Sequence, residues 1–271
     1  MGDQSWTLGE GPLLIEALIV ANLATAAGLA FALKRTVVRR ARRRQRNVFS
    51  SWPIPTASPD AVAPALVLGP LGPAPDSEIV ALPNYYVPGG IGDVEAWVLC
   101  NLAKTARLVF EFGTATGKTT YLLARNAPPE ARIVSLTLPP DAASLYCDAE
   151  GDDPHARRAA LSESASGFIY LGTPVAAKIT QLFGDSKAFD ATPYAELCDL
   201  VFVDASHARS YVQSDSRKAL AMVRPGGHVL WHDYTGPSGA RGVYDVLNAL
   251  ARDLPLQHIK GTTLVAYRKP L

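Results

Sequence analysis

The stretch RLVFEFGTATGKTT, from Arg107 to Thr120, decides the fold. It joins a short apolar run with β propensity to a turn that contains two glycines and then to a helical pattern. An apolar run of this length suits a strand buried on both faces of a parallel sheet. Gly113 lets the backbone approach a ligand closely, and Gly117 opens the helix. We therefore expect a strand, a ligand-binding turn and a helix in this order.

The same alternation of strand and helix patterns continues to the C-terminus. It predicts an α/β fold with a doubly wound, mostly parallel sheet that carries helices on both faces. In such sheets a ligand binds beyond the carboxyl ends of the strands, so the residues that follow each run are the candidates for a site. The later runs are Arg132 to Leu136, Lys178 to Phe183, Asp199 to Asp204, His228 to His232 and Thr263 to Tyr267.

The turn fits neither of two common phosphate-binding loops. A Walker A loop needs glycine where Phe112 stands, and a G-x-G-x-x-G dinucleotide loop needs glycine where Glu111 and Thr116 stand. What remains is an acid followed by two spaced glycines. An acidic side chain repels pyrophosphate and attracts a cation, and S-adenosylmethionine presents a sulfonium and an ammonium group. The turn therefore favours S-adenosylmethionine over NAD.

Three later strings support the same hypothesis: GDS at Gly184 to Ser186, DLVFVDASH at Asp199 to His207, and RPGGHVLWHDY at Arg224 to Tyr234. In this order and spacing, the chain from about Tyr85 onward resembles the class I S-adenosylmethionine-dependent methyltransferases. Within that superfamily it looks most like the bacterial "methyltransferase domain 24" group. The resemblance implies a Rossmann-like methyltransferase fold with a seven-stranded sheet, and an enzyme that uses S-adenosylmethionine.

The resemblance also implies which residues bind the cofactor. Glu111 and Gly113 would hold its methionine end, and Asp185 would reach its adenine amino group. Where the family has an acid that grips the ribose hydroxyls, this chain offers Thr137, which supplies one hydrogen bond instead of a bidentate grip. The full set of expected cofactor-binding residues is Glu111, Gly113, Thr114, Gly117, Thr137, Asp185, Ser186 and Asp204.

Two residues are the catalytic candidates, because the resemblance places Asp204 and His207 at the opening of the acceptor site. Methyl transfer from an activated donor requires the enzyme mainly to align the partners and to help deprotonate the acceptor. His207 is the candidate base because an imidazole titrates near neutrality. The alternative is a histidine that only caps or orients the following helix. We expect an oxygen acceptor, with nitrogen as the alternative.

A metal site is a further hypothesis. Asp204, His232 and Asp233 end adjacent central strands, and they resemble the metal-binding trio of metal-dependent O-methyltransferases, with His232 where those enzymes often carry an acid. Mg²⁺ or another divalent cation there would lower the pKa of an acceptor hydroxyl. The alternative is that Asp204 serves the cofactor or the structure and that the HDY string only forms hydrogen bonds within its loop.

The N-terminal third has a different composition. After a tail, residues 1–12, the apolar residues 13–33 are long enough at about 1.5 Å per residue to cross a bilayer, and they lack the basic front of a signal peptide. The basic residues 34–46 place the following domain in the cytoplasm and would contact anionic lipid or, as the alternative, RNA. We expect the proline-rich residues 47–88 to be a linker or an arm along the surface, and residues 89–271 to be the methyltransferase domain.

Composition limits the function classes. The net charge of +1 hides the basic juxtamembrane segment, and the rest of the chain is weakly acidic, which disfavours a nucleic acid partner. Three classes stay open: a methyltransferase with a small-molecule or lipid-linked acceptor, a NAD-dependent oxidoreductase, and a membrane scaffold that binds the cofactor without turnover. The missing third glycine and Glu111 disfavour the oxidoreductase.

Overall fold

The computed structural model describes residues 19–23, 25–26, 28–35, 52–69, 72–83, 90–164 and 167–271. The chain divides into two compact units, Met1–Asn47 and Val48–Leu271. In the first unit every described residue is helical and exposed. Among the described residues, no helix has both the length and the apolar character needed to cross a membrane. Parts of the predicted span, residues 13–18, 24 and 27, and of the basic segment, residues 36–46, lie outside the described residues.

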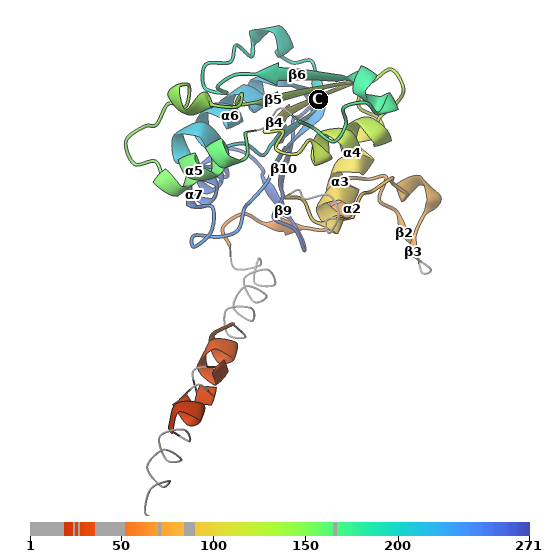
Figure 1. Cartoon of the computed structure of the whole chain (residues 1–271). Coiled ribbons are helices and arrows are strands. Elements are labelled where there is room, and N and C mark those ends of the chain that lie inside the picture. The colour runs from red at the N-terminus through yellow and green to blue at the C-terminus, as the bar shows by residue number, and fades with distance from the viewer. Residues whose placement is uncertain are drawn as a thin grey trace, which may run out of the picture. The chain divides into compact units, whose positions relative to one another are not determined.

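The second unit is built on one eight-stranded sheet with the order β1-β9-β10-β8-β7-β4-β5-β6 (Figure 1). Five strands run parallel: β4 (Leu108–Phe112), β5 (Arg132–Thr137), β6 (Ile179–Phe183), β7 (Cys198–Val203) and β8 (Val223–Trp231). At the other end, β10 (Val265–Arg268) runs antiparallel to both β8 and β9 (Gln257–Ile259). The expected mostly parallel sheet is confirmed.

The sheet has one strand more than the seven expected, and it comes from the proline-rich segment. β1 (Thr56–Ala57) pairs in parallel with β9, at the edge where a short strand tolerates nearby prolines. Ile54 and Leu66 on either side are buried in the hydrophobic core. The expected boundary at residue 88 is therefore wrong, because the segment packs on the domain as an arm. Its other elements are α2 (Pro59–Val62), β2 (Leu68–Gly69), β3 (Gly72–Pro73) and η2 (Pro75–Ser77).

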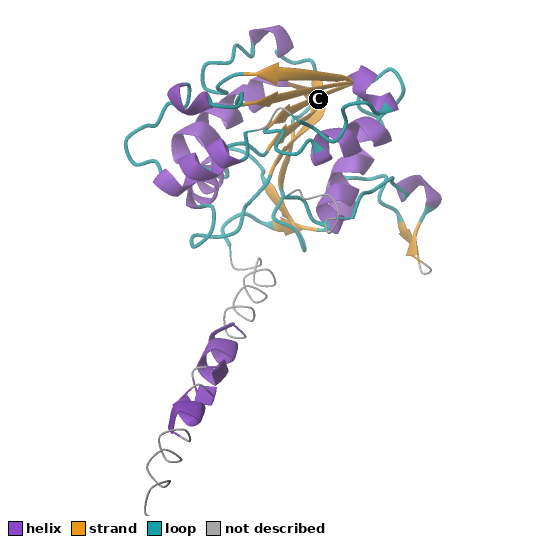
Figure 2. Cartoon of the chain, in the orientation of Figure 1, coloured by secondary structure: helices purple, strands orange, loops and turns teal. Residues whose placement is uncertain are grey.

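Helices cover both faces of the sheet (Figure 2). The side chains of successive strand residues alternate between faces, so Val109 of β4 packs in one hydrophobic cluster and Phe110 in the other. The Val109 cluster holds α3 (Asp93–Ala103) and α4 (Lys118–Asn126), and the Phe110 cluster holds α6 (Arg209–Met222) and α7 (Arg241–Leu250). The predicted double winding is thus present.

A long connection between β5 and β6 lies beside the carboxyl ends of the strands. It contains η3 (Ala142–Ser144), α5 (Pro154–Ser162) and η4 (Pro174–Lys178), and η5 (Thr192–Tyr194) follows β6. Ala156 of α5 packs with Tyr146, Ala208 and Tyr211, so the connection is held against the start of α6. This packing forms one wall of the pocket described next.

Candidate active site

A pocket lies beyond the carboxyl ends of β4, β5, β6 and β7. Five of the residues singled out from the sequence line it, each at the end of a strand or in the segment that follows one. They are Gly113, Thr137, Ser186, Asp204 and His207. The rule that ligands bind at strand ends therefore located the pocket correctly.

Gly113 forms the floor of the pocket through a conformation that other residues rarely adopt. Its φ is +96°, and its N–H donates to the carbonyl of Leu136 at 2.8 Å. A Cβ atom at this position would collide with the backbone carbonyl of Asp204. Glycine thus lets the turn after β4 pack directly on the end of β7, which leaves the space above it open.

Asp185, expected on the adenine side, lies between two pocket-lining residues in the sequence, Gly184 and Ser186, but does not itself line the pocket. This carboxylate is buried, and its Oδ1 accepts a hydrogen bond from the Lys187 N–H at 3.0 Å. Its Oδ2 is one of the buried side-chain oxygens with no hydrogen-bond partner in the described part of the chain. An unpaired buried acceptor costs free energy unless a ligand donor satisfies it. Together with Ser186 and Thr137 in the pocket wall, Asp185 is therefore suited to a purine amino group.

Besides Asp185, three further expected cofactor residues are absent from the pocket lining. Glu111 is fully buried and accepts hydrogen bonds from Ser135, at 2.5 Å, and from Thr120. Thr114 is also buried and bonds to Ser135, while Gly117 lies against the ring of Tyr170. None of the three is among the residues that line the pocket. The expectation that Glu111 faces the methionine end of a cofactor is wrong for this structure.

Burial also removes the charge on which that expectation depended. Desolvation raises the pKa of Glu111 to about 8, against the opposing effect of the Ser135 and Thr120 hydrogen bonds. The side chain is therefore mostly neutral at pH 7. The acidic residues that line the pocket are instead Asp204, at the end of β7, and Glu163.

The buried carboxyl group predicts a pH-dependent stability. The pKa of Glu111 rises from 4.5 to about 8 on folding, so between these values the folded state holds a proton that the unfolded state has lost. The free energy of unfolding therefore falls as the pH rises through this window, by up to about 4 kcal/mol. We expect Glu111→Gln to remove this component in urea denaturation at pH 5 and pH 8.5. The exposed Glu130→Gln is the control, and equal pH dependence in all three proteins would contradict the account.

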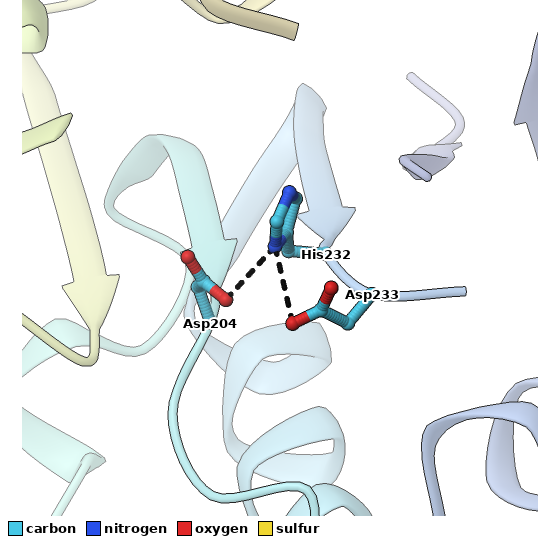
Figure 3. A group of neighbouring side chains, drawn as sticks. All are labelled: Asp204, His232 and Asp233. Carbon is cyan, nitrogen blue, oxygen red and sulfur yellow. Dashed lines mark hydrogen bonds and ion pairs between the residues drawn. The ribbon is translucent and has the colours of Figure 1, made fainter. Parts of the chain in front are cut away.

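Asp204, His232 and Asp233 meet at the ends of β7 and β8, as the sequence predicted (Figure 3). The Nδ1 atom of His232 lies 3.2 Å from Asp204 Oδ1 and 3.4 Å from Asp233 Oδ2. Asp233 is held in the left-handed region at φ +60°, which turns its carboxylate toward the two neighbours. His232 is only 4% exposed, so the cluster opens to solvent through the two aspartates.

A second carboxylate contact fixes the other side of the His232 ring. Nε2 of His232 lies 3.3 Å from Oε2 of the buried Glu95 on α3. Burial alone would lower the pKa of His232, but the surrounding Asp204, Asp233 and Glu95 raise it well above its ordinary value. Burial would likewise raise the pKa of Glu95, but hydrogen bonds with His232, Gly92 and Thr263 lower it to about 2.

His207 lies on the pocket side of this cluster. Its Nε2 is 2.9 Å from Asp233 Oδ2, and its side chain is 35% exposed. Burial would lower the pKa of His207, but Asp233, Asp204 and Glu163 raise it. Because Asp233 engages Nε2, Nδ1 is the nitrogen placed to exchange a proton with a ligand. This carboxylate–imidazole arrangement is the usual way in which a histidine base is oriented.

The trio also has the chemistry of a divalent metal site. One atom from each of Asp204, His232 and Asp233 lies within 4.8 Å of the others. Two carboxylates and an imidazole suit a divalent cation, and metal-binding histidines commonly donate their second ring N–H to a carboxylate. Glu95 provides that carboxylate here. The residues therefore fit the metal hypothesis.

Several pocket residues escaped the sequence interpretation. Glu163, at the end of α5, and Tyr146 and Ser206, whose hydroxyls lie 2.6 Å apart, line the wall opposite the β4 turn. Burial raises the pKa of Glu163. Tyr146 and Glu163 lie in the β5–β6 connection, where no quoted motif marks them, and Ser206 lies inside the DLVFVDASH string without having been singled out. Glu95 could have been suspected only as an acid in the first turn of a helix.

Comparison with known proteins gives one family match, which covers less than half of the chain. The family described as a methyltransferase domain matches residues 110–234, which contain the pocket and its metal-type trio. No curated protein matches the chain. The solved structures supply only a general likeness.

One of those structures is the O-methyltransferase TomG from Streptomyces achromogenes, involved in tomaymycin synthesis; it is 20% identical, covers 69% of this chain and 85% of that chain, and has a TM-score of 0.46. Another is the O-methyltransferase from Bacillus cereus, which is 18% identical, covers 68% of this chain and 86% of that chain, and has a TM-score of 0.45. A protein from Corynebacterium glutamicum is also similar (13%, 69% and 85%, 0.47). At these identities and scores, the three structures carry no argument about the substrate of this chain.

Proposed function

We propose that this chain moves a methyl group from S-adenosylmethionine to an oxygen of a small-molecule or lipid-linked acceptor, because residues 110–234 match a methyltransferase domain family. One observation carries the proposal: the matched residues line a pocket at the strand ends that brings Gly113 and Ser186 together with Asp204 and His207. The pocket thus joins a binding surface to a candidate base.

In this proposal the cofactor lies along the strand ends. The methyl group is already activated by the positive sulfur, so the protein supplies mainly position. Gly113 admits the cofactor close to the backbone, and the Asp204 carboxylate faces its positively charged methionine end. Asp185 Oδ2 accepts from the adenine amino group, and Thr137 bonds to the ribose with one hydroxyl.

His207 takes the proton from the acceptor. Its ring is held by Asp233 at 2.9 Å, so Nδ1 keeps a fixed direction while the acceptor oxygen attacks the methyl carbon. The apolar α5 side chains Ala156, Ala159 and Ala160 line the adjacent wall and limit access of water to this end of the pocket. The wall also leaves room for a partly apolar acceptor.

Asp204, His232 and Asp233 would hold Mg²⁺ or another divalent cation, which would lower the pKa of the acceptor hydroxyl. We expect exhaustive EDTA treatment to lower methyl transfer at least about tenfold and added Mg²⁺ to restore it. Restored activity measured in the same sample is the control for damage by the chelator. Full activity after EDTA would instead support the alternative in which the HDY string only stabilises its loop.

We further propose that residues 13–33 anchor the protein in a membrane and that the basic residues 34–46 lie on its cytoplasmic face. Protease protection in sealed vesicles tests the orientation, which a sheltered C-terminal domain would overturn.

The proposed activity is tested by incubating the purified full chain with membranes and methyl-labelled S-adenosylmethionine, and identifying the labelled product by mass. We expect one labelled O-methyl product that is absent with the Gly113→Ala protein. Cofactor binding with no product from any extract would favour the non-catalytic scaffold. Binding of NADH in preference to S-adenosylmethionine would favour the oxidoreductase.

A further inference from the structure

Glu95 is a buried acid that lies outside the residues matched by the methyltransferase family. Both of its carboxylate oxygens are engaged. Oε1 accepts from the N–H and the hydroxyl of Thr263 at 2.7 and 2.8 Å, and Oε2 accepts from the Gly92 N–H at 2.5 Å. The remaining contact of Oε2 is His232 Nε2 at 3.3 Å. Glu95 thus ties the turn before α3 and the segment before β10 to the site.

The two nitrogens of His232 have different surroundings. Nε2 faces Glu95, whereas Nδ1 faces Asp204 and Asp233. The hydrogen bond made by one ring nitrogen decides which nitrogen keeps a lone pair. A His232 that donates Nε2–H to Glu95 therefore presents the Nδ1 lone pair to the space between the two aspartates.

We propose that Glu95 is a positioning residue that fixes the ring and tautomer of His232, so that Nδ1 completes a divalent cation site with Asp204 and Asp233. The inference rests on the site of the proposed function and extends it to α3 and Thr263. Glu95 does not touch the cation. It acts through Nε2 of His232, and the other hydrogen bonds hold its carboxylate in place.

Glu95→Gln tests this role sharply, because each oxygen of Glu95 faces two donors. In either orientation an amide would place its NH₂ group against an N–H. We expect the variant to bind Mn²⁺ about 10- to 100-fold more weakly than the wild type. The measurement is the electron paramagnetic resonance signal of free Mn²⁺ in a titration of the full-length protein. The matched control is Thr263→Val, which removes one hydroxyl from the same carboxylate and should change Mn²⁺ affinity less than about twofold.

A second measurement needs no variant and so does not depend on whether Glu95→Gln folds. In ¹⁵N-histidine-labelled wild-type protein saturated with Mg²⁺, we expect His232 to carry its proton on Nε2 and none on Nδ1. A proton on Nδ1, wild-type Mn²⁺ affinity in Glu95→Gln, or no Mn²⁺ binding by the wild type would each overturn the inference. Calorimetry with S-adenosylmethionine on the same protein separates the two failures. A protein that binds S-adenosylmethionine but no Mn²⁺ overturns this inference alone, and a protein that binds Mn²⁺ but no S-adenosylmethionine overturns the proposed function alone.

Discussion

Replacing Gly113 by alanine is expected to abolish measurable binding of S-adenosylmethionine, with a loss of affinity of at least about 100-fold. Alanine at φ +96° costs roughly 1–2 kcal/mol of backbone strain. In addition, the new Cβ atom would collide with the Asp204 carbonyl, and the turn after β4 would have to move into the pocket. The measurement is a calorimetric titration of the full-length variant, with its thermal midpoint recorded in parallel.

The control for Gly113→Ala is Gly261→Ala, which separates strain from collision. Gly261 has a similar φ of +82°, but no atom lies within 4 Å of the position that its Cβ would take. This variant should lose stability slightly and keep wild-type affinity for S-adenosylmethionine. If Gly113→Ala also kept wild-type affinity, the cofactor would not lie against the β4 turn.

The second large effect is expected for His207→Gln, which should lower kcat by about 10² to 10⁴. Glutamine keeps a polar group near Asp233 but has no nitrogen that accepts the acceptor's proton. Since His207 is proposed to contact the acceptor and not the cofactor, affinity for S-adenosylmethionine should change little. Single-turnover methyl transfer and calorimetry on the same preparation measure the two quantities.

His155→Gln is the matched control, because His155 is an exposed histidine on α5. It should behave as the wild type in both assays. The alternative in which His207 only orients the following helix predicts the reverse pattern for His207→Gln, namely a lowered thermal midpoint with kcat almost unchanged. That outcome would show that His207 is not the base that accepts the proton.

The main sheet was predictable because its strands are buried on both faces. Runs such as Asp199 to Asp204 are continuously apolar in their middle, and burial on both faces is what the structure shows for β7. The same logic located the site, since residues that end parallel strands meet at one edge. Asp204, His232 and Asp233 are brought together for this reason.

The arm and Glu95 were not predictable from local pattern. Proline suppresses the periodic signals of helix and strand, so the burial of Ile54 and Leu66 and the pairing of β1 left no trace in the sequence. Glu95 meets Thr263 across 168 positions of the chain. Contacts of such separation are set by the tertiary fold.

The expectation that Glu111 faces the cofactor failed for a different reason. Its position at the end of a strand was read correctly, but the side to which it points was not. β4 alternates, and Glu111 shares the face of Val109, where Ser135 and Thr120 cover it. The carboxylate expected to attract a positively charged ligand is therefore Asp204, which lies in the pocket wall, and not Glu111.

The most direct test of the account is one calorimetric experiment in which the full-length protein is titrated with S-adenosylmethionine and, separately, with NADH. We predict saturable 1:1 binding of S-adenosylmethionine that Asp185→Asn weakens about tenfold, since the unpaired Oδ2 loses its role as acceptor. No binding of NADH is expected. Binding of NADH with no heat from S-adenosylmethionine would contradict the assignment of this pocket and the activity proposed for it.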